Sequence, residues 1–165
     1  MITQSQEQFL RSANRISMDV RIQLGKIIDE NSTKYEWGKA VIENFSKDLT
    51  ASFPGNTGFS VRNLAYMRQF YNEYNQYAEL INIAKEVSWR TNIVIMTKVK
   101  EPEARGFYLS MAAETMCNRD VISAQISSKA FERGFLQDKK HNFNSTLPEV
   151  QCYCTFGLAT ITTYI

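Results

Sequence analysis

The chain has 165 residues, the length of a single domain with a core of its own. Its 19 Lys and Arg residues against 17 Asp and Glu leave a formal charge of +2, so nucleic-acid binding would need a local basic patch. Only 7 Gly and 3 Pro residues occur, and so few chain breakers predict long helices rather than a strand-rich sandwich. No apolar run approaches the ~20 residues of a membrane helix, so we expect no membrane partner.

The inventory of reactive side chains argues against an enzyme. His141 is the only histidine, and the sequence places no serine and acid beside it for nucleophilic catalysis. The cysteines Cys117, Cys152 and Cys154 are too few for a tetrahedral zinc site, and an odd, sparse set suits a reducing cytoplasm. No phosphate-binding glycine loop occurs, and we interpret the D-x-K match at residues 138–140 as a charged loop. We therefore expect no catalytic residue, no metal and no cofactor.

The first predicted element is a helix over residues 9–28. Its apolar residues recur at steps of three and four and mark one stripe, with arginines at the edge of the core. Residues 31–33 (NST) break this pattern, and a capping box from Thr33 to Glu36 predicts a second helix, which ends at the FPGNTG turn of residues 53–58. The stripe of the first helix is Phe9, Ala13, Ile16, Val20, Leu24 and Ile27, and that of the second is Trp37, Val41, Phe45 and Leu49.

Further helices are predicted after Ser60. This residue is a good N-cap for a third helix, and a weaker helical pattern continues from residue 80 to residue 87. The run NIVIMTKV over residues 92–99 is β-branched and fits a strand as well as a helix. Pro102 at a first helical turn and Asn118 as a cap predict two last helices, the second reaching about residue 135. The inner stripe of the third helix is Val61, Leu64, Met67, Tyr71 and Tyr74.

Residues 33–74 have the layout of a helix-turn-helix unit: a helix, a glycine-bearing turn and a second helix. In such units the second helix enters the major groove, where arginine pairs with guanine, and asparagine and glutamine pair with adenine. We therefore predict a DNA-binding surface on this segment. The predicted base contacts are Arg62, Asn63, Tyr66 and Gln69, the predicted phosphate contacts are Lys39, Lys47, Thr57 and Ser60, and Arg68 should add positive charge on the same side.

The same segment also has a plain structural interpretation. Every helical hairpin has a turn, and this one is longer than the three or four residues that are usual in the motif. Glu73 on the third helix would repel a phosphate. The alternative is a surface that packs against protein. An aromatic segment, Phe70 to Tyr77, and the apolar tail favour docking to a nuclease subunit or to a second copy of the chain.

Several motifs, in order and at consistent spacing, resemble one family. GFSVRNL (58–64) and YMRQFY (66–71) resemble the core motif of the YhcG-type proteins, regarded as bacterial nucleases of the PD-(D/E)xK superfamily. The resemblance spans roughly residues 20–148. Its other parts are YEWGK (35–39), SKDL (46–49), SW (88–89), KEPEARGFY (100–108), RDV (119–121), QI (125–126), NF (142–143) and TLP (146–148).

This resemblance implies that the chain corresponds to the amino-terminal half of the family, a helical, winged-helix-like module thought to bind DNA. The nuclease fold and its metal-binding carboxylates belong to the carboxy-terminal half. Thr91 stands where the family has His, and Cys117 where it often has Trp. After Pro148 the sequence departs from the family, so no catalytic acid or lysine is carried over.

These observations lead to one set of expectations. The fold should be mainly α, a multi-helix domain with a helix-turn-helix core of the winged-helix kind and room for a small β wing. Residues 1–148 should form the amino-terminal domain and residues 149–165 a divergent tail. The expected function is a cytoplasmic DNA-binding module without the catalytic half, and therefore not an enzyme. The alternative is a protein-interaction or oligomerisation module that docks a nuclease subunit.

Overall fold

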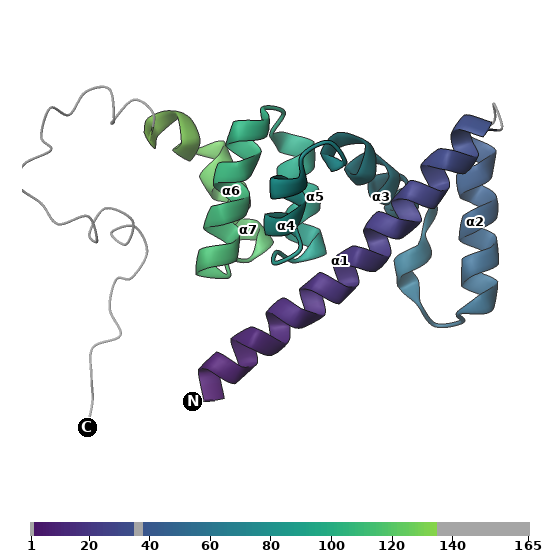
Figure 1. The fold of residues 1–165 in the computed structure, drawn as a ribbon, viewed down its shortest axis with the longest axis horizontal. Coiled ribbons are helices and arrows are strands. Elements are labelled where there is room, and N and C mark those ends of the chain that lie inside the picture. The colour runs from purple at the N-terminus through teal and green to yellow at the C-terminus, as the bar shows by residue number, and fades with distance from the viewer. Residues whose placement is uncertain (1, 35–37, 135–165) are drawn as a thin grey trace, which may run out of the picture. The chain divides into compact units, whose positions relative to one another are not determined.

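The computed structural model describes residues 2–34 and 38–134, which are mainly helical (Figure 1). No strand occurs in these ranges, so the mainly α expectation is confirmed, whereas the β wing and the winged-helix core are not. The predicted boundary at 148/149, residues 138–141, Cys152 and Cys154 lie outside the described residues. The elements are α1 (Ile2–Lys34), α2 (Gly38–Ser52), the 3-10 helix η1 (Thr57–Phe59), α3 (Val61–Tyr74), α4 (Ala78–Ala84), α5 (Trp89–Lys98), α6 (Pro102–Thr115) and α7 (Arg119–Ser127).

Residues 1–131 form one compact unit, which two apolar clusters hold together. In the larger cluster Phe70 and Tyr74 stack with their ring centroids 4.2 Å apart, and Trp89 meets Phe70 edge-on at 5.8 Å. Phe70 and Tyr74 of the aromatic segment that favoured docking are buried in the core, whereas Tyr71 is half-buried and Tyr77 is 37% exposed. The smaller cluster joins α1, α2 and α3 through Ile28, Ile42, Leu64 and Met67. Helix α3 contributes to both clusters and is the element around which the others pack.

Helix α1 buries a different face from the stripe that its sequence indicates. Met18, Gly25 and Ile28 are buried, whereas 72% of Phe9 and 68% of Ile16 are exposed. The expectation that this stripe lies against the core is therefore wrong. The reason is that α1 packs through the close backbone approach at Gly25, through the buried Met18 and Ile28, and through polar side chains, so that only Leu24 of the predicted stripe packs against the core.

Polar contacts fix the first half of α1. Arg11 and Arg15 both pair with Glu86, which follows α4, the former at 2.5 Å. Arg11 also donates a hydrogen bond to the carbonyl oxygen of Ala113 on α6 at 3.0 Å, and Asn14 donates to the carbonyl oxygen of Glu86 at 3.1 Å. Hydrogen bonds from Arg15 and Arg11 lower the pKa of Glu86. These contacts direct the polar side of α1 toward the unit and its apolar stripe toward solvent.

The second half of α1 continues through the predicted break at residues 31–33. The helix runs to Lys34, and the Asn31 amide donates to the carbonyl oxygen of Ile27 within the helix at 2.7 Å instead of capping a new one. Ser32 is buried on the same helix. The predicted break is therefore wrong. Residues 35–37, which include Tyr35 and Glu36 of the predicted capping box, lie outside the described residues.

The ambiguous segment at residues 92–99 is helical. Ser88 caps α5 by accepting a hydrogen bond from the backbone N–H of Thr91. The buried Asn92 amide donates to the carbonyl oxygens of Ala84, Val87 and Ser88 at 2.9, 3.0 and 3.2 Å. These bonds tie the end of α4 to α5, and with the Ser88 cap they outweigh the β preference of the branched residues.

The last helices begin at the predicted caps. Pro102 opens α6, and the Asn118 side chain accepts hydrogen bonds from two backbone N–H groups at the start of α7. Between these helices Met116 has a φ of 49°, a left-handed conformation that ends α6. Helix α7 ends at Ser127 and the chain is helical again over residues 130–134, so the single helix predicted to reach residue 135 is interrupted.

Gly25 sits where α1 crosses α3, and an added methyl group there should destabilise the fold. A Cβ atom at this position would lie 2.8 Å from the carbonyl carbon of Met67, so the two backbones would have to separate. We expect Gly25→Ala to lower the free energy of unfolding by about 1–3 kcal/mol, measured by urea denaturation. Gly134→Ala is the control, because a Cβ atom there meets nothing within 4 Å. Equal stability of the two variants would contradict the proposed close approach.

The ion pairs of Glu86 should make stability depend on pH. Because the folded state lowers the pKa of Glu86, the carboxylate stabilises the fold at neutral pH, and this contribution disappears as the pH falls through the lowered pKa. We expect Glu86→Gln to lower the melting temperature at pH 7, and the difference from the unchanged protein to shrink steadily below about pH 4. Glu30→Gln, at an exposed site on α1, is the control and should change the melting temperature little. A difference that stays constant down to pH 2 would contradict this account.

Candidate nucleic-acid interface

The candidate interface is formed by the end of α2, the 3-10 helix η1 and the start of α3. Gly55 in the turn has a φ of 92°, a conformation that favours glycine. The Ser60 hydroxyl caps α3 by accepting a hydrogen bond from the backbone N–H of Asn63 at 3.3 Å. Ser46 of α2 donates to the carbonyl oxygen of Phe59 at 2.7 Å. The turn is thus attached to both helices that it connects.

The side chain of Asn63 is engaged within the unit. Its amide nitrogen donates to the carbonyl oxygen of Gly58 at 2.6 Å, and its oxygen accepts a hydrogen bond from the indole N–H of Trp89 at 2.8 Å. Asn63 therefore links the turn to α5. These two bonds fix the orientation of the amide, which is directed toward the turn and α5.

Arg62 and Tyr66 form a pair on the first turns of α3. Arg62 is exposed, and its guanidinium donates to the Tyr66 hydroxyl at 3.0 Å while lying 5.5 Å from the centre of the ring. Within the described residues the guanidinium makes no ion pair with a carboxylate. The guanidinium of Arg62 is therefore exposed to solvent at the start of α3, and its hydrogen-bond partner, the Tyr66 hydroxyl, is neutral.

Arg68 lies on a different side of α3 from Arg62 and is paired with an acid. Its guanidinium donates to Asp29 of α1 at 2.9 Å, and Asn72 donates to the same oxygen at 2.9 Å. Hydrogen bonds from Asn72 and from Arg68 lower the pKa of Asp29. The structure therefore uses Arg68 to join α3 to α1, and its charge is compensated there.

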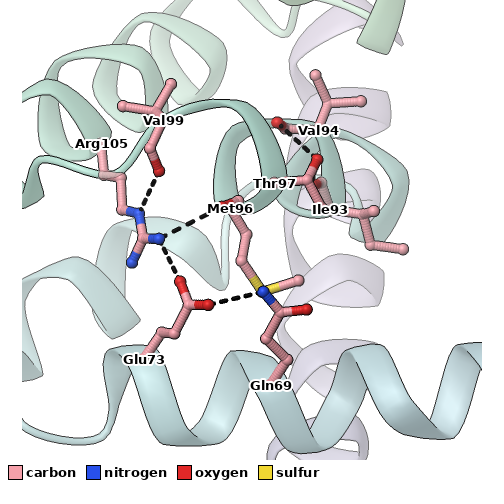
Figure 2. Close-up of polar contacts among 8 residues, drawn as sticks. All are labelled: Gln69, Glu73, Ile93, Val94, Met96, Thr97, Val99 and Arg105. Carbon is pink, nitrogen blue, oxygen red and sulfur yellow. Dashed lines mark hydrogen bonds and ion pairs between the residues drawn. The ribbon is translucent and has the colours of Figure 1, made fainter.

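Gln69 and Glu73 belong to a polar network with α6 (Figure 2). The Glu73 carboxylate lies between the Gln69 amide, which donates at 2.7 Å, and the guanidinium of Arg105. Arg105 is 5% exposed, and it also donates to the carbonyl oxygens of Val99 at 2.8 Å and Met96 at 3.3 Å. This network orients α3 against α5 and α6, and it balances the charge of Glu73.

The remaining predicted residues lie around the turn. Thr57, the first residue of η1, and Lys47 on α2 are exposed, as is Ser60. Lys39 is in the first turn of α2, and its side chain lies outside the described part of the structure. The exposed members of the predicted set are therefore Thr57, Ser60, Arg62 and Lys47, whereas Asn63, Arg68 and Gln69 are hydrogen-bonded within the unit.

Three residues that shape this surface were not among the predicted ones. Asp29, Trp89 and Arg105 hold Arg68, Asn63 and Glu73, respectively. Trp89 and Arg105 do fall in motifs that resemble the YhcG-type family, SW and KEPEARGFY. The motifs indicate that these positions matter, but only the fold shows that they act by orienting α3.

Among residues 2–34 and 38–134, no helix is long and apolar enough to cross a bilayer. The same residues contain no group of three His, Cys, Asp or Glu side chains that could hold a metal ion. The family described as the DUF1016 N-terminal domain matches residues 1–133, which confirms the resemblance to the amino-terminal domain of the YhcG-type proteins. No curated protein and no solved structure matches the chain.

Loss of the Arg105 guanidinium should destabilise the unit strongly. Arg105→Ala would leave Glu73 without its cation and two carbonyl oxygens at the end of α5 without a donor. Breaking such a buried pair costs about 3–5 kcal/mol, and urea denaturation measures it. Arg119→Ala is the matched control, because its pair with Asp120 is exposed and should contribute less than about 1 kcal/mol. Similar losses in the two variants would show that the buried network does not orient α3.

Proposed function

Because the chain belongs to the DUF1016 N-terminal domain family, we propose that residues 1–133 form a DNA-binding module. In this proposal the turn before α3 and the first turns of α3 face the DNA. The observation that carries it is Arg62, an exposed guanidinium at the start of α3 whose partner is the Tyr66 hydroxyl and not an acid. An arginine in this state can pair with the edge of a guanine without first leaving a carboxylate.

The pairing of Arg62 with Tyr66 favours recognition because it limits the freedom of the side chain. The ring lies beside the guanidinium, so less conformational entropy is lost when the arginine binds. In the proposed complex Arg62 contacts a base, and Tyr66 supports it from the next turn of the helix. Gln69, a turn further along, keeps its bond to Glu73.

Contacts with phosphates would come from the turn and from α2. Thr57 and Ser60 offer exposed hydroxyls, and Lys47 offers an exposed ammonium group. The amino-terminal end of α3 adds a partial positive charge on the same segment. In this proposal the hydroxyls, the ammonium group and the helix end contact phosphates. Asn63 and Arg68 instead hold α3 in place through their hydrogen bonds within the unit.

The affinity for duplex DNA tests this proposal. We expect binding, measured by fluorescence anisotropy with a labelled duplex, to weaken by about 1–3 kcal/mol in Arg62→Ala if this residue contacts a base. Binding should also weaken steeply between about 50 mM and 200 mM salt, because phosphate contacts release counterions. The matched control is Arg119→Ala, which removes an exposed arginine from α7. No retention of DNA at low salt, or equal affinities of the two variants, would contradict the proposal.

A further inference from the structure

Helix α1 carries an apolar face that is exposed among the described residues. We call this face the outer seam, and it includes four of the five large apolar residues of α1 that are exposed, Leu10 being the fifth. Phe9 is 72% exposed, Ile16 68%, Val20 52% and Ile27 41%. The exposed Ala13 and Gln23 complete the series. The outer seam comprises Phe9, Ala13, Ile16, Val20, Gln23 and Ile27.

The outer seam lies on the side of α1 opposite to its own unit. The buried side is marked by Met18 and Gly25, seven residues apart. Ile16 and Val20 lie two residues before and after Met18, which places each about 200° around the helix from it. A partner could therefore contact the whole seam without disturbing the packing of α1 on α3.

The first turns of α1 gain little from the rest of the chain. Residues 4–10 are all exposed, and they include Phe9 and Leu10. A helix end that buries little apolar surface is marginal in water. A partner along the outer seam would supply the missing contacts for these turns.

The spacing of the seam indicates a helical partner. Phe9, Ile16 and Gln23 are seven residues apart, and so are Ala13, Val20 and Ile27. These two series correspond to the d and a positions of a heptad repeat, which is the pattern by which helices pair as coiled coils. An apolar groove on an unrelated protein would not require the outer seam to repeat every seven residues from Phe9 to Ile27.

We propose that α1 pairs with α1 of a second copy of the chain, parallel and in register. In that arrangement Gln23 meets Gln23 of the second copy, so the two amides can hydrogen-bond each other in an otherwise apolar seam. The flanking residues Asp19 and Lys26 would face Leu24 and Asn31 of the second copy, and no like charges meet. The charged residues that flank the outer seam are therefore compatible with a parallel pair of identical helices.

The antiparallel arrangement fits less well. If Phe9 lay against Ile27 of the second copy, Gln23 would face Ala13, which cannot satisfy its amide. The same register would bring Asp19 near Asp19 of the second copy. The unsatisfied Gln23 amide and the proximity of the two Asp19 carboxylates both favour the parallel arrangement. The inference is independent of DNA binding, because the outer seam shares no residue with the candidate interface.

The mass of the full chain in solution tests the pairing. Light scattering after size-exclusion chromatography should give twice the chain mass of 19.0 kDa at micromolar concentrations. Val20→Asp places a charge in the outer seam and should give the monomer mass. Val121→Asp is the matched control, because Val121 is also exposed, at 42%, but lies on α7. Circular dichroism verifies that both variants remain helical. A monomeric unchanged protein, or a Val20→Asp variant that remains dimeric, would overturn the proposal.

Disulfide cross-linking tests the orientation. In a chain with its three native cysteines replaced by serine, Gln23→Cys should form a covalent dimer with itself on oxidation, because parallel helices bring residue 23 of both copies together. An antiparallel pair would instead link Gln23→Cys to Ala13→Cys in a mixture of the two proteins. Formation of the mixed product without the self-linked one would overturn the parallel arrangement.

Discussion

The position of α3 depends on one buried charge. The Arg105 guanidinium reaches two carbonyl oxygens at the end of α5, the carboxylate of Glu73 on α3, and the face of Tyr74, whose ring centre is 5.0 Å away. Removing such a group from water is costly, and only a full set of partners compensates for it. The end of α5 contributes as well, because the carbonyl end of a helix attracts positive charge. One side chain thereby fixes the relative placement of three helices.

The same contacts also neutralise a negative charge on α3, the helix of the proposed DNA-binding face. In the sequence, Glu73 is a negative charge on α3, the helix that is proposed to approach DNA, and it would repel a phosphate. In the folded unit its carboxylate is directed at Arg105 and bonded by Gln69, so the charge is balanced locally. Asp29 is balanced in the same way by Arg68. Within the described residues Arg62 makes no ion pair, so no carboxylate compensates its charge at the start of α3.

The local signals in the sequence predicted the fold well where a cap or turn carried them. Ser60 and Asn118 cap the helices that follow them, because a hydroxyl or amide at such a position bonds a free N–H whatever surrounds it. The orientation of α1 could not be predicted in this way. Phe9 and Ile16 lie outward, and the buried face is set by Gly25, Arg11 and Asn14, whose partners are distant in sequence. The same holds for Asn63 and Arg68, since Trp89 and Asp29 become their neighbours only after folding.

The crossing at Gly25 has a mechanical consequence. Where two helices touch through side chains, rotamer changes can absorb a displacement, but here backbone lies directly on backbone. The Glu86 ion pairs are made by residues of α1 before this contact, and the Asp29 ion pair is made by a residue after it. Because Asp29 is paired with Arg68 of α3, a rotation of α1 about this crossing would have to break ion pairs on at least one side of it, so the crossing fixes α1 relative to the helix that carries Arg62.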